Sequence, residues 1–332
     1  MKYYLETISA GKDLHSELAR SLMLSVIDGE FSDMEIGGLL MALKTKGETA
    51  AEIAGFTQAL LERSIRVDLQ DDTAVDCCGT GGDGSGSFNI STAAAIIAAG
   101  AGARVAKHGN RSVSSKCGSA DLLEFCGVRI DLGVKAVQES FQRSGICFMF
   151  APRFHPGIKA VMPARKALGV RTVFNMLGPL LNPARVKRQL LGVYSKDVMP
   201  LFAETLQQLG SERALVVHSH DGLDELSASA PTDVIEISAG EVTSYTVTPA
   251  ELGVEGTGID SIAGGDAQDN QALLVGLLNG RQTGARPATL ANAGAIIYLA
   301  GVAKSIQDGV ALAKESLDSG AAREVLADWI NQ

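Results

Sequence analysis

The first seventy residues carry a helical pattern of apolar positions. Leucine and valine recur every fourth residue from Leu14 to Val26, after a possible cap at Asp13. The segments 32–35 and 49–52 have the Ser/Thr-x-x-Glu pattern of a capping box, and each precedes a further apolar run. The pattern therefore predicts three short helices, which together form a small helical lobe.

Beyond residue 74, short apolar runs alternate with helical stretches. The runs predict strands at 74–78, 104–107, 146–150, 190–194, 214–218 and 234–237. Helices are expected at 91–101, 120–126 and 197–209, and again from residue 269 to the end. Strands that alternate with helices predict an α/β fold, with a mostly parallel central sheet flanked by helices.

One segment, 162–183, does not fit this alternation, because proline and glycine interrupt it. We expect it to return to the helical lobe. The predicted domains are therefore a helical lobe of residues 1–70, with a return of roughly 162–183, and a larger α/β lobe of residues 71–161 and 184–332.

Composition and charge exclude several classes of partner. The chain has 332 residues with 29 Lys and Arg against 38 Asp and Glu, a net charge of −9. Binding of the nucleic-acid backbone needs a positive footprint, so no nucleic acid is expected as partner. The longest apolar run, 93–103, is far shorter than the roughly 18 residues of a membrane span, and the first residues lack a signal-peptide pattern. We expect a cytoplasmic protein that has no membrane partner and whose five cysteines are reduced.

The first candidate for chemistry is a glycine-rich loop after the first predicted strand. Five glycines lie between Gly79 and Gly86, and a helix follows. Glycines let a backbone approach a ligand closely, and a helix N-terminus attracts anions. Asn89, Ser91 or Thr92 can cap that helix. The loop is predicted to hold phosphate; the alternative is a plain flexible turn before an ordinary cap.

The same loop permits a second interpretation. Gly79, Gly81 and Gly84 match G-x-G-x-x-G, which by itself is a weak sign of dinucleotide binding. A dinucleotide fold needs an acid at the end of the second strand, where this chain has the basic Lys107. Asp83, within the loop, would also repel a pyrophosphate. A nicotinamide-dependent oxidoreductase is therefore the second choice.

The loop after the second predicted strand, 107–119, is basic. Four Lys and Arg and no acid lie between Arg104 and Lys116. The alternative is a solvated surface turn. Because both loops follow the carboxyl ends of strands, we predict a pocket for a substrate with several phosphates.

Two further features are open to more than one interpretation. The adjacent carboxylates Asp224 and Glu225 suit Mg²⁺, but alone such a pair is more often an exposed helix start. Arg165 lies in an apolar stretch, where it either extends to solvent or binds a carboxylate. Residue chemistry alone does not decide between these roles.

Taken together, the motifs resemble those of the anthranilate phosphoribosyltransferases. The matching segments run in order along nearly the whole chain: 79–83, 89–92, 107–111 with 114–115, 118–121, 171–175 with 177–179, and 224–227. The resemblance implies a homodimer of two-lobed subunits of the nucleoside phosphorylase and phosphoribosyltransferase kind. It also implies the second step of tryptophan biosynthesis: anthranilate and 5-phosphoribosyl-1-pyrophosphate (PRPP) give N-(5-phosphoribosyl)anthranilate and pyrophosphate, with Mg²⁺ as cofactor.

The resemblance also assigns residues to roles. Those implied to bind PRPP are Gly79, Gly82, Asp83, Ser87, Asn89, Ile90, Ser91, Thr92, Lys107, His108, Gly109, Asn110, Arg111, Ser112, Val113, Ser114, Ser115 and Ser119. Those implied to contact anthranilate are Gly79, His108, Asn110 and Arg165. Those implied to bind magnesium are Ser91, Asp224 and Glu225. The catalytic set is then Lys107, His108, Asp224 and Glu225.

The implied reaction is a substitution at the anomeric carbon of ribose through a loose, positively charged transition state. We expect Mg²⁺, Lys107 and backbone N–H groups to stabilise the departing pyrophosphate. His108 is a candidate general base, and two lobes suggest hinge closure. Remaining alternatives are a pyrimidine nucleoside phosphorylase, which shares the architecture, and a non-catalytic binding protein.

The chain departs from the family pattern in three places. Residues 154–156 read Phe-His-Pro where many relatives have His-His-Pro, and Gly157-Ile158 replaces Ala-Met. Both departures are expected near the aromatic-acid pocket, so they bear on tolerance for substituted anthranilates. Cys77-Cys78 replaces an apolar pair, a change that a buried strand accepts.

Overall fold

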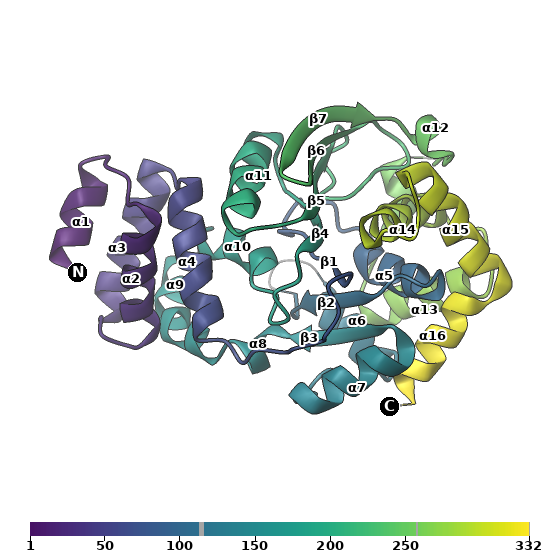
Figure 1. The fold of residues 1–332 in the computed structure, drawn as a ribbon, viewed down its shortest axis with the longest axis horizontal. Helices are drawn as coiled ribbons and strands as arrows, with labels where there is room; N and C mark the ends of the chain where they lie inside the picture. The colour runs from purple at the N-terminus through teal and green to yellow at the C-terminus, as the bar shows by residue number, and fades with distance from the viewer. Residues whose placement is uncertain (113–115, 257, 332) are drawn as a thin grey trace.

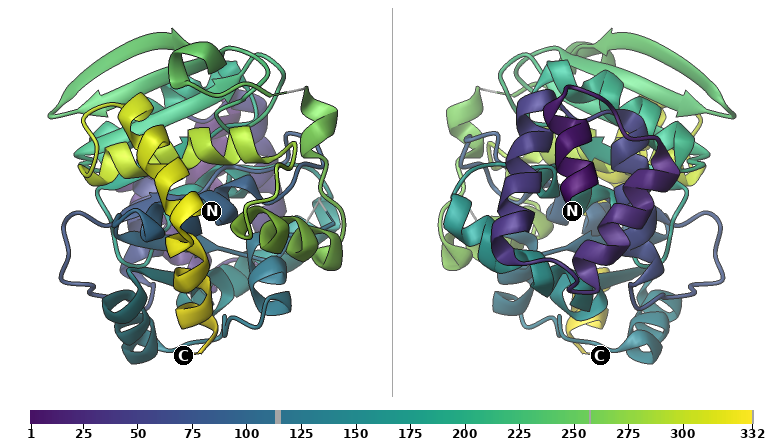
Figure 2. Two further views of the ribbon diagram at one scale, coloured as in Figure 1. Left: turned by 90° about the vertical axis from the view of Figure 1, so that its right-hand side faces the viewer. Right: turned by 90° about the vertical axis from the view of Figure 1, so that its left-hand side faces the viewer.

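The computed structural model describes residues 1–112, 116–256 and 258–331, and it has a helical end and an α/β body (Figure 1). The helices of the first seventy residues are α1 (Lys2–Ser9), α2 (Ser16–Ile27), α3 (Asp33–Lys46) and α4 (Ala50–Glu62). Helix α1 was not predicted, so the expectation of three helices in this fully described stretch was wrong. Figure 2 shows these helices stacked across one end of the molecule, with the C-terminal helices at the other.

The predicted helix starts are largely confirmed. Both capping boxes are formed, by Ser32 with Glu35 and by Thr49 with Glu52. The cap at Asp13 was wrong: the N-cap of α2 is His15, whose ring accepts a hydrogen bond from the amide of Leu18. Asp13 is drawn away from the helix end because it pairs with Lys46 at 2.7 Å.

The central sheet confirms the predicted α/β class. Within the described residues it has seven strands in the order β3-β2-β1-β4-β5-β6-β7. Their bounds are β1 (Val75–Cys77), β2 (Val105–Gly109), β3 (Ile146–Phe150), β4 (Arg188–Gly192), β5 (Arg213–Ser219), β6 (Thr232–Ser238) and β7 (Glu241–Val247). The first five are parallel, and β6 and β7 are antiparallel. Strand β7 was not predicted, because it is an edge strand that is exposed except at its last residue and so lacks an apolar pattern.

Helices cover both faces of the sheet. The longer ones are α5 (Ile90–Gly100), α6 (Ser119–Phe125), α7 (Val134–Ser144), α11 (Met199–Gln208), α13 (Ala267–Leu278), α14 (Arg286–Ala300), α15 (Ile306–Ser319) and α16 (Ala321–Ile330). The short ones are α8 (Ala151–Phe154), α9 (Met162–Leu168), α10 (Phe174–Leu177) and α12 (Pro249–Leu252). Helices α5 and α14 pack against each other and against β1, which forms the core on one face.

The core on the other face is continuous with the helical end. A single buried cluster contains apolar residues of α2–α4, of α11 and of strands β4 and β5, such as Leu191 and Val216. The segment 162–183 belongs to this cluster through Ala164 and Phe174, since α9 packs on α3 and α10 packs on α4. This segment therefore lies between the helical end and the sheet.

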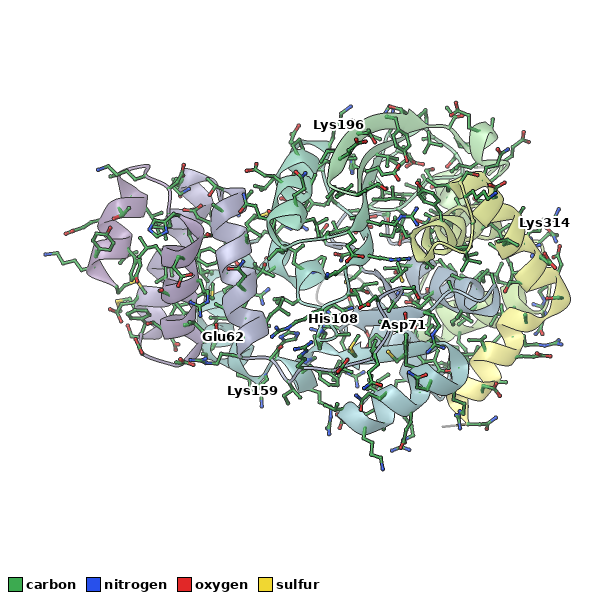
Figure 3. The ribbon with its side chains drawn as sticks, in the orientation of Figure 1. Glu62, Asp71, His108, Lys159, Lys196 and Lys314 are labelled. Atoms are coloured by element: carbon green, nitrogen blue, oxygen red, sulfur yellow. The ribbon has the colours of Figure 1, made fainter. Side chains whose placement is uncertain are left out.

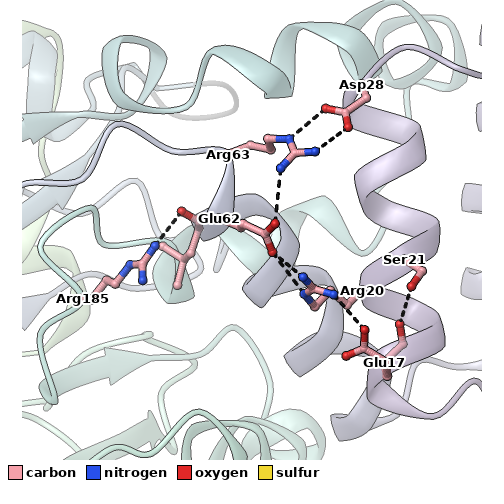
Figure 4. Close-up of polar contacts among 8 residues, drawn as sticks. Glu17, Arg20, Ser21, Asp28, Glu62, Arg63 and Arg185 are labelled. Atoms are coloured by element: carbon pink, nitrogen blue, oxygen red, sulfur yellow. Dashed lines mark hydrogen bonds and ion pairs between the residues drawn. The ribbon is translucent and has the colours of Figure 1, made fainter.

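Ion pairs join α2 to α4 on the surface of the helical end (Figure 4). Arg63 binds both carboxylate oxygens of Asp28, at 3.0 and 2.7 Å, and Arg20 binds Glu62 at 2.6 Å. Arg185, in the connection to β4, donates a 3.0 Å hydrogen bond to the carbonyl of Leu61. This contact ties the end of α4 to the α/β body.

None of the helices in the described residues is both long and apolar enough to cross a membrane. All five cysteines are free thiols, and Cys77 is buried in β1 as expected of a strand residue.

Candidate active site

The candidate site lies where the winding of the sheet reverses. From β1 the chain proceeds outward through β2 and β3, and then returns to place β4 on the other side of β1. Open α/β sheets bind ligands in the crevice at such a switch point. The glycine-rich loop spans this crevice: the amide of Thr80 donates to Gly192 at 2.9 Å, and Thr80 Oγ1 accepts from the amide of Tyr194 at 3.1 Å.

The acidic pair lies directly against this loop. The amide of Gly81 donates a 2.8 Å hydrogen bond to Asp224 Oδ2, and a Cβ on Gly79 would lie 2.8 Å from the same oxygen. Glycine at position 79 is therefore needed for the close approach. The Asp83 carboxylate accepts a hydrogen bond from the hydroxyl of Ser85, shared between its two oxygens, and lies near enough to Asp224 for its charge to act on that group.

The burial and close spacing of these carboxyl groups raise the pKa values of Asp224 and Glu225. Burial first, and the charge of Asp83 second, raise the pKa of Asp224 to about 7. Burial and the charge of Asp224 raise the pKa of Glu225 well above its ordinary value. A cation bound beside these carboxyls would favour their charged forms and so lower both pKa values.

The donor set fits magnesium shared with a substrate. Among the described residues, no three His, Cys, Asp or Glu side chains gather into a metal cage. Mg²⁺ usually takes only one or two carboxylates and completes its shell with water and phosphate oxygens. The Asp224–Glu225 pair suits this pattern, and the backbone amide of Ser91, the third predicted ligand, is near enough to Glu225 to act on its pKa.

The N-terminus of α5 is open toward the crevice. Asn89, one of the three residues predicted as possible caps, occupies the N-cap position, but its side chain makes no capping hydrogen bond. Its amide nitrogen Nδ2 donates instead to the carbonyl of Cys117 at 3.2 Å. Within the described residues, Asn89 Oδ1 and Thr92 Oγ1 are buried without a partner. The helix has no side-chain cap, although the amide of its first residue, Ile90, donates to the carbonyl of Phe88. This arrangement is a place for an anion.

Lys107 lies buried between the end of β1 and the start of α5. Its ammonium donates to the carbonyl of Cys77 at 2.5 Å and to Ser91 Oγ at 3.2 Å. Burial alone would lower the pKa of Lys107, but neighbouring acidic groups, Asp76 and Glu225 among them, hold it above the ordinary value. The site thus has a permanent positive charge beside the helix N-terminus.

His108 follows Lys107 on β2, in the part of the sheet that lies nearest the helical end (Figure 3). Its buried ring packs edge-on against His155, with 5.3 Å between the ring centroids. Burial and the neighbouring His155 lower the pKa of His108 to about 3. An efficient general base has a pKa near the working pH, so this environment argues against that predicted role.

The rest of the basic loop is partly occupied by its own contacts. Arg111 pairs with Glu124 at 2.8 Å and with Asp121 at 3.1 Å on helix α6. The amide of Ser112 also binds Asp121, at 3.0 Å, and Ser119 Oγ donates to the carbonyl of Asn110 at 3.3 Å. The predicted residues Val113, Ser114 and Ser115 lie outside the described residues.

Two more predicted residues, Ser87 and Gly109, lie at the edges of the site. Ser87 pairs with Ala263 in an isolated bridge at the end of the glycine-rich loop. Gly109 ends β2, where a Cβ would lie 2.7 Å from the ring of Phe148, so a larger residue does not fit.

Arg165 is on α9, on the helical side of the crevice. It is half-buried, its guanidinium lies 5.3 Å from the ring centroid of Phe174, and no acidic residue in the described part of the chain pairs with it. Burial lowers the pKa of Arg165. An unpaired, half-buried guanidinium suits a carboxylate ligand.

The two departures at 154–158 are both packed against other elements. Phe154 is buried in a cluster with Phe141 and Met149, and a Cβ on Gly157 would lie 3.3 Å from Ile27 Cβ. The neighbouring His155, rather than Phe154, contacts His108.

Sequence reasoning missed three residues of this region. Asp76 is fully buried in β1 and accepts a 3.1 Å hydrogen bond from the amide of His108; the signal was a charged residue inside an apolar strand. Asn182 donates to the carbonyl of Ala106 at 2.8 Å. Arg171 contacts the glycine-rich loop, and the sequence signals this contact only through the motif that contains it.

Two family models match the chain. The model of the glycosyl transferase family helical bundle domain matches residues 2–64, and that of the glycosyl transferase family a/b domain matches residues 71–323. The structure of anthranilate phosphoribosyltransferase from Thermus thermophilus is similar with a TM-score of 0.93 and 41% identity, over 99% of this chain and 98% of that one.

Further similarities point the same way. The Saccharomyces cerevisiae anthranilate phosphoribosyltransferase in complex with PRPP and Mg has a TM-score of 0.90 and 29% identity, over 99% of this chain and 96% of that one. The anthranilate phosphoribosyltransferase of Haloferax volcanii is 49% identical over 97% of both chains. That of Desulfatibacillum aliphaticivorans is 46% identical over 96% of this chain and 94% of its own. With these similarities and the arrangement of its site, the chain belongs to the anthranilate phosphoribosyltransferase family.

Proposed function

We propose that this protein transfers the 5-phosphoribosyl group of PRPP to the amine of anthranilate, giving N-(5-phosphoribosyl)anthranilate and pyrophosphate. The observation that carries the proposal is the crevice itself. Its α/β side has an acidic pair against a glycine-rich loop, and helix α9, which packs on α3 of the helical end, carries the unpaired guanidinium of Arg165. A diphosphate with magnesium and an aromatic carboxylate are the two ligands that these groups suit.

The groups of the α/β side stabilise the leaving pyrophosphate. The N-terminus of α5, which has no side-chain cap, and the ammonium of Lys107 carry positive charge, and these groups are in place before the reaction begins. Magnesium, held by Asp224, Glu225 and Ser91, would neutralise the diphosphate as negative charge builds on it. Preorganised charge of this kind often contributes more to catalysis than any other single effect.

The groups of the helical side orient the acceptor. Arg165 binds the carboxylate of anthranilate, while the neutral ring of His108 lines the path of the aromatic ring. An aryl amine is already neutral at pH 7, so it needs positioning more than deprotonation. Gly79 and Asn110 are proposed to complete this contact set.

The test is the decay of anthranilate fluorescence with purified protein, PRPP and Mg²⁺, each omitted in turn. Loss of fluorescence only when all three are present supports the reaction and its metal requirement together. If fluorescence persists although calorimetry detects PRPP binding, the acceptor is wrong. The segment 154–158 is then the place to look for a different aromatic pocket.

We also propose that residues 1–70 with 162–183 act as one lobe that closes on the other. The packing of α9 on α3 supports this division. Small-angle scattering should show compaction with PRPP and Mg²⁺, and unchanged curves would contradict closure. A homodimer and a cytoplasmic location complete the proposal; light scattering and cell fractionation test them.

A further inference from the structure

Arg171 reaches from the connection between α9 and α10 to the glycine-rich loop across the crevice. Its guanidinium donates to the carbonyl of Gly81 at 2.9 Å and to the carbonyl of Gly82 at 3.4 Å. Gly82 has a φ of +74°, and a Cβ there would lie 2.7 Å from the Arg171 guanidinium. The left-handed backbone is what favours glycine at this position, and the absence of a Cβ lets the guanidinium approach the loop closely.

These two hydrogen bonds determine which way the loop presents its N–H groups. In a trans peptide the C=O and N–H of one unit point in opposite directions. With the carbonyls of Gly81 and Gly82 directed at Arg171, the N–H groups of Gly82 and Asp83 are directed away from it. Successive N–H groups in left-handed turns form concave anion sites, and a cation on the carbonyl side polarises them further.

Arg171 is itself held from two sides. Its guanidinium carbon lies 4.0 Å from the ring centroid of Tyr194, at the end of β4, a distance at which cation and ring attract. Its backbone carbonyl accepts a 2.7 Å hydrogen bond from the ammonium of Lys44 on α3. One residue thus connects the helical end, the strand beside the switch point and the loop.

We propose that Arg171 is a positioning residue, which holds the glycine-rich loop in the form that binds the diphosphate of PRPP. The inference rests on the function proposed above and adds to it a group that does not touch substrate. Because the Arg171 guanidinium contacts the carbonyls of Gly81 and Gly82, its loss affects the loop at the diphosphate half of the site, and we expect little effect on the anthranilate half, where Arg165 is proposed to bind.

The experiment compares Arg171→Gln with the unmodified protein in steady-state kinetics and in calorimetry with PRPP and Mg²⁺. Loss of two charge-assisted hydrogen bonds should raise the KM for PRPP at least about 10-fold. The KM for anthranilate should stay within about 2-fold, and Arg171→Lys should recover part of the loss. Arg185→Gln is the matched control, since it also removes an arginine bonded to a backbone carbonyl but far from the loop.

A second variant keeps the test decisive if Arg171→Gln does not fold. Tyr194→Leu removes the ring that supports the guanidinium, and it should raise the KM for PRPP by about 5-fold. Unchanged KM and affinity for PRPP in an active, folded Arg171→Gln protein would overturn the inference and leave the proposed function standing. An equal rise in both KM values would overturn it too, because that is the result of a purely structural role. If the unmodified protein shows no turnover, the proposed function fails and the inference with it.

Discussion

The buried carboxylate of Asp76 accepts a 3.1 Å hydrogen bond from the backbone amide of His108 and so joins β1 to β2 below the site. The backbone ladder between these two strands pairs only Val75 with Val105. Beyond that pair, the side chain of Asp76 takes the place of a ladder hydrogen bond. His108 is thus held from both sides, by the buried acid on β1 and by its pairing with Met149 on β3.

This acid should give the protein a recognisable pH dependence. Burial is the main cause that raises the pKa of Asp76 to about 6, above the roughly 3.9 of an unfolded chain. A raised pKa contributes stability that is present below pH 3.9 and is lost as the pH rises through about 6. Asp76→Asn keeps the acceptor but removes this titration. Relative to that variant, the unmodified protein should gain about 1 to 1.5 kcal/mol between pH 7.5 and 5.

Urea unfolding at the two pH values measures this difference. Equal changes in stability for the two proteins would mean that Asp76 does not titrate in this range. Activity of Asp76→Asn at pH 7.5 should stay within a few-fold, since the hydrogen bond to His108 is preserved.

Loss of either acidic side chain of the crevice should abolish most turnover. In Asp224→Asn or Glu225→Gln the group that would hold the cation is neutral, and we expect a fall in kcat of at least about 100-fold with a raised Mg²⁺ requirement. Glu255→Gln is the control, as it removes the charge of an exposed glutamate. Full turnover of the double variant Asp224→Ala/Glu225→Ala at limiting Mg²⁺ would refute the metal assignment.

Arg165 should act on the acceptor alone. Arg165→Gln removes a charge-assisted partner of the carboxylate, so the KM for anthranilate should rise by about 10- to 100-fold while the KM for PRPP changes little. Aniline, which lacks the carboxylate, serves as the matched substrate: any turnover with aniline should be alike in both proteins. An equal loss with anthranilate and with aniline would show that Arg165 has another role.

His108 should not appear in the pH profile of the reaction. With its pKa lowered to about 3 by burial and by His155, the imidazole is neutral throughout the range from pH 5.5 to 8. The profile of kcat/KM should therefore have the same shape in His108→Asn, which loses contact with the acceptor but no titrating group. A limb with a pKa between 6 and 7 that disappears in His108→Asn would restore the general-base hypothesis.

Local sequence patterns correctly predicted the helix caps and strands whose structure depends mainly on residues close in the sequence. The capping boxes at Ser32 and Thr49 form as predicted, because both partners of each lie within one turn of helix. The strand at 146–150 has the predicted bounds, since a continuous apolar run of five residues is typical of a strand that is buried on both faces of a sheet. Strand β7 and the cap at Asp13 failed because long-range partners, the sheet edge and Lys46, determine them.

The sequence by itself determined the α/β class, the two loops at strand ends and, by resemblance, the family. In these two loops the glycines, serines and basic residues lie within a few positions of each other in the sequence. Their capacity to bind phosphate can therefore be predicted without knowledge of the fold. The tertiary structure alone decided that Asp224 meets Gly81, that His108 is buried against His155, and that Arg171 contacts the glycine-rich loop. These contacts join residues that are about 30 to 140 positions apart in the sequence, so a local sequence pattern does not predict them. The burial of a side chain depends on all the elements packed around it, so its effect on a pKa cannot be predicted from a local pattern either.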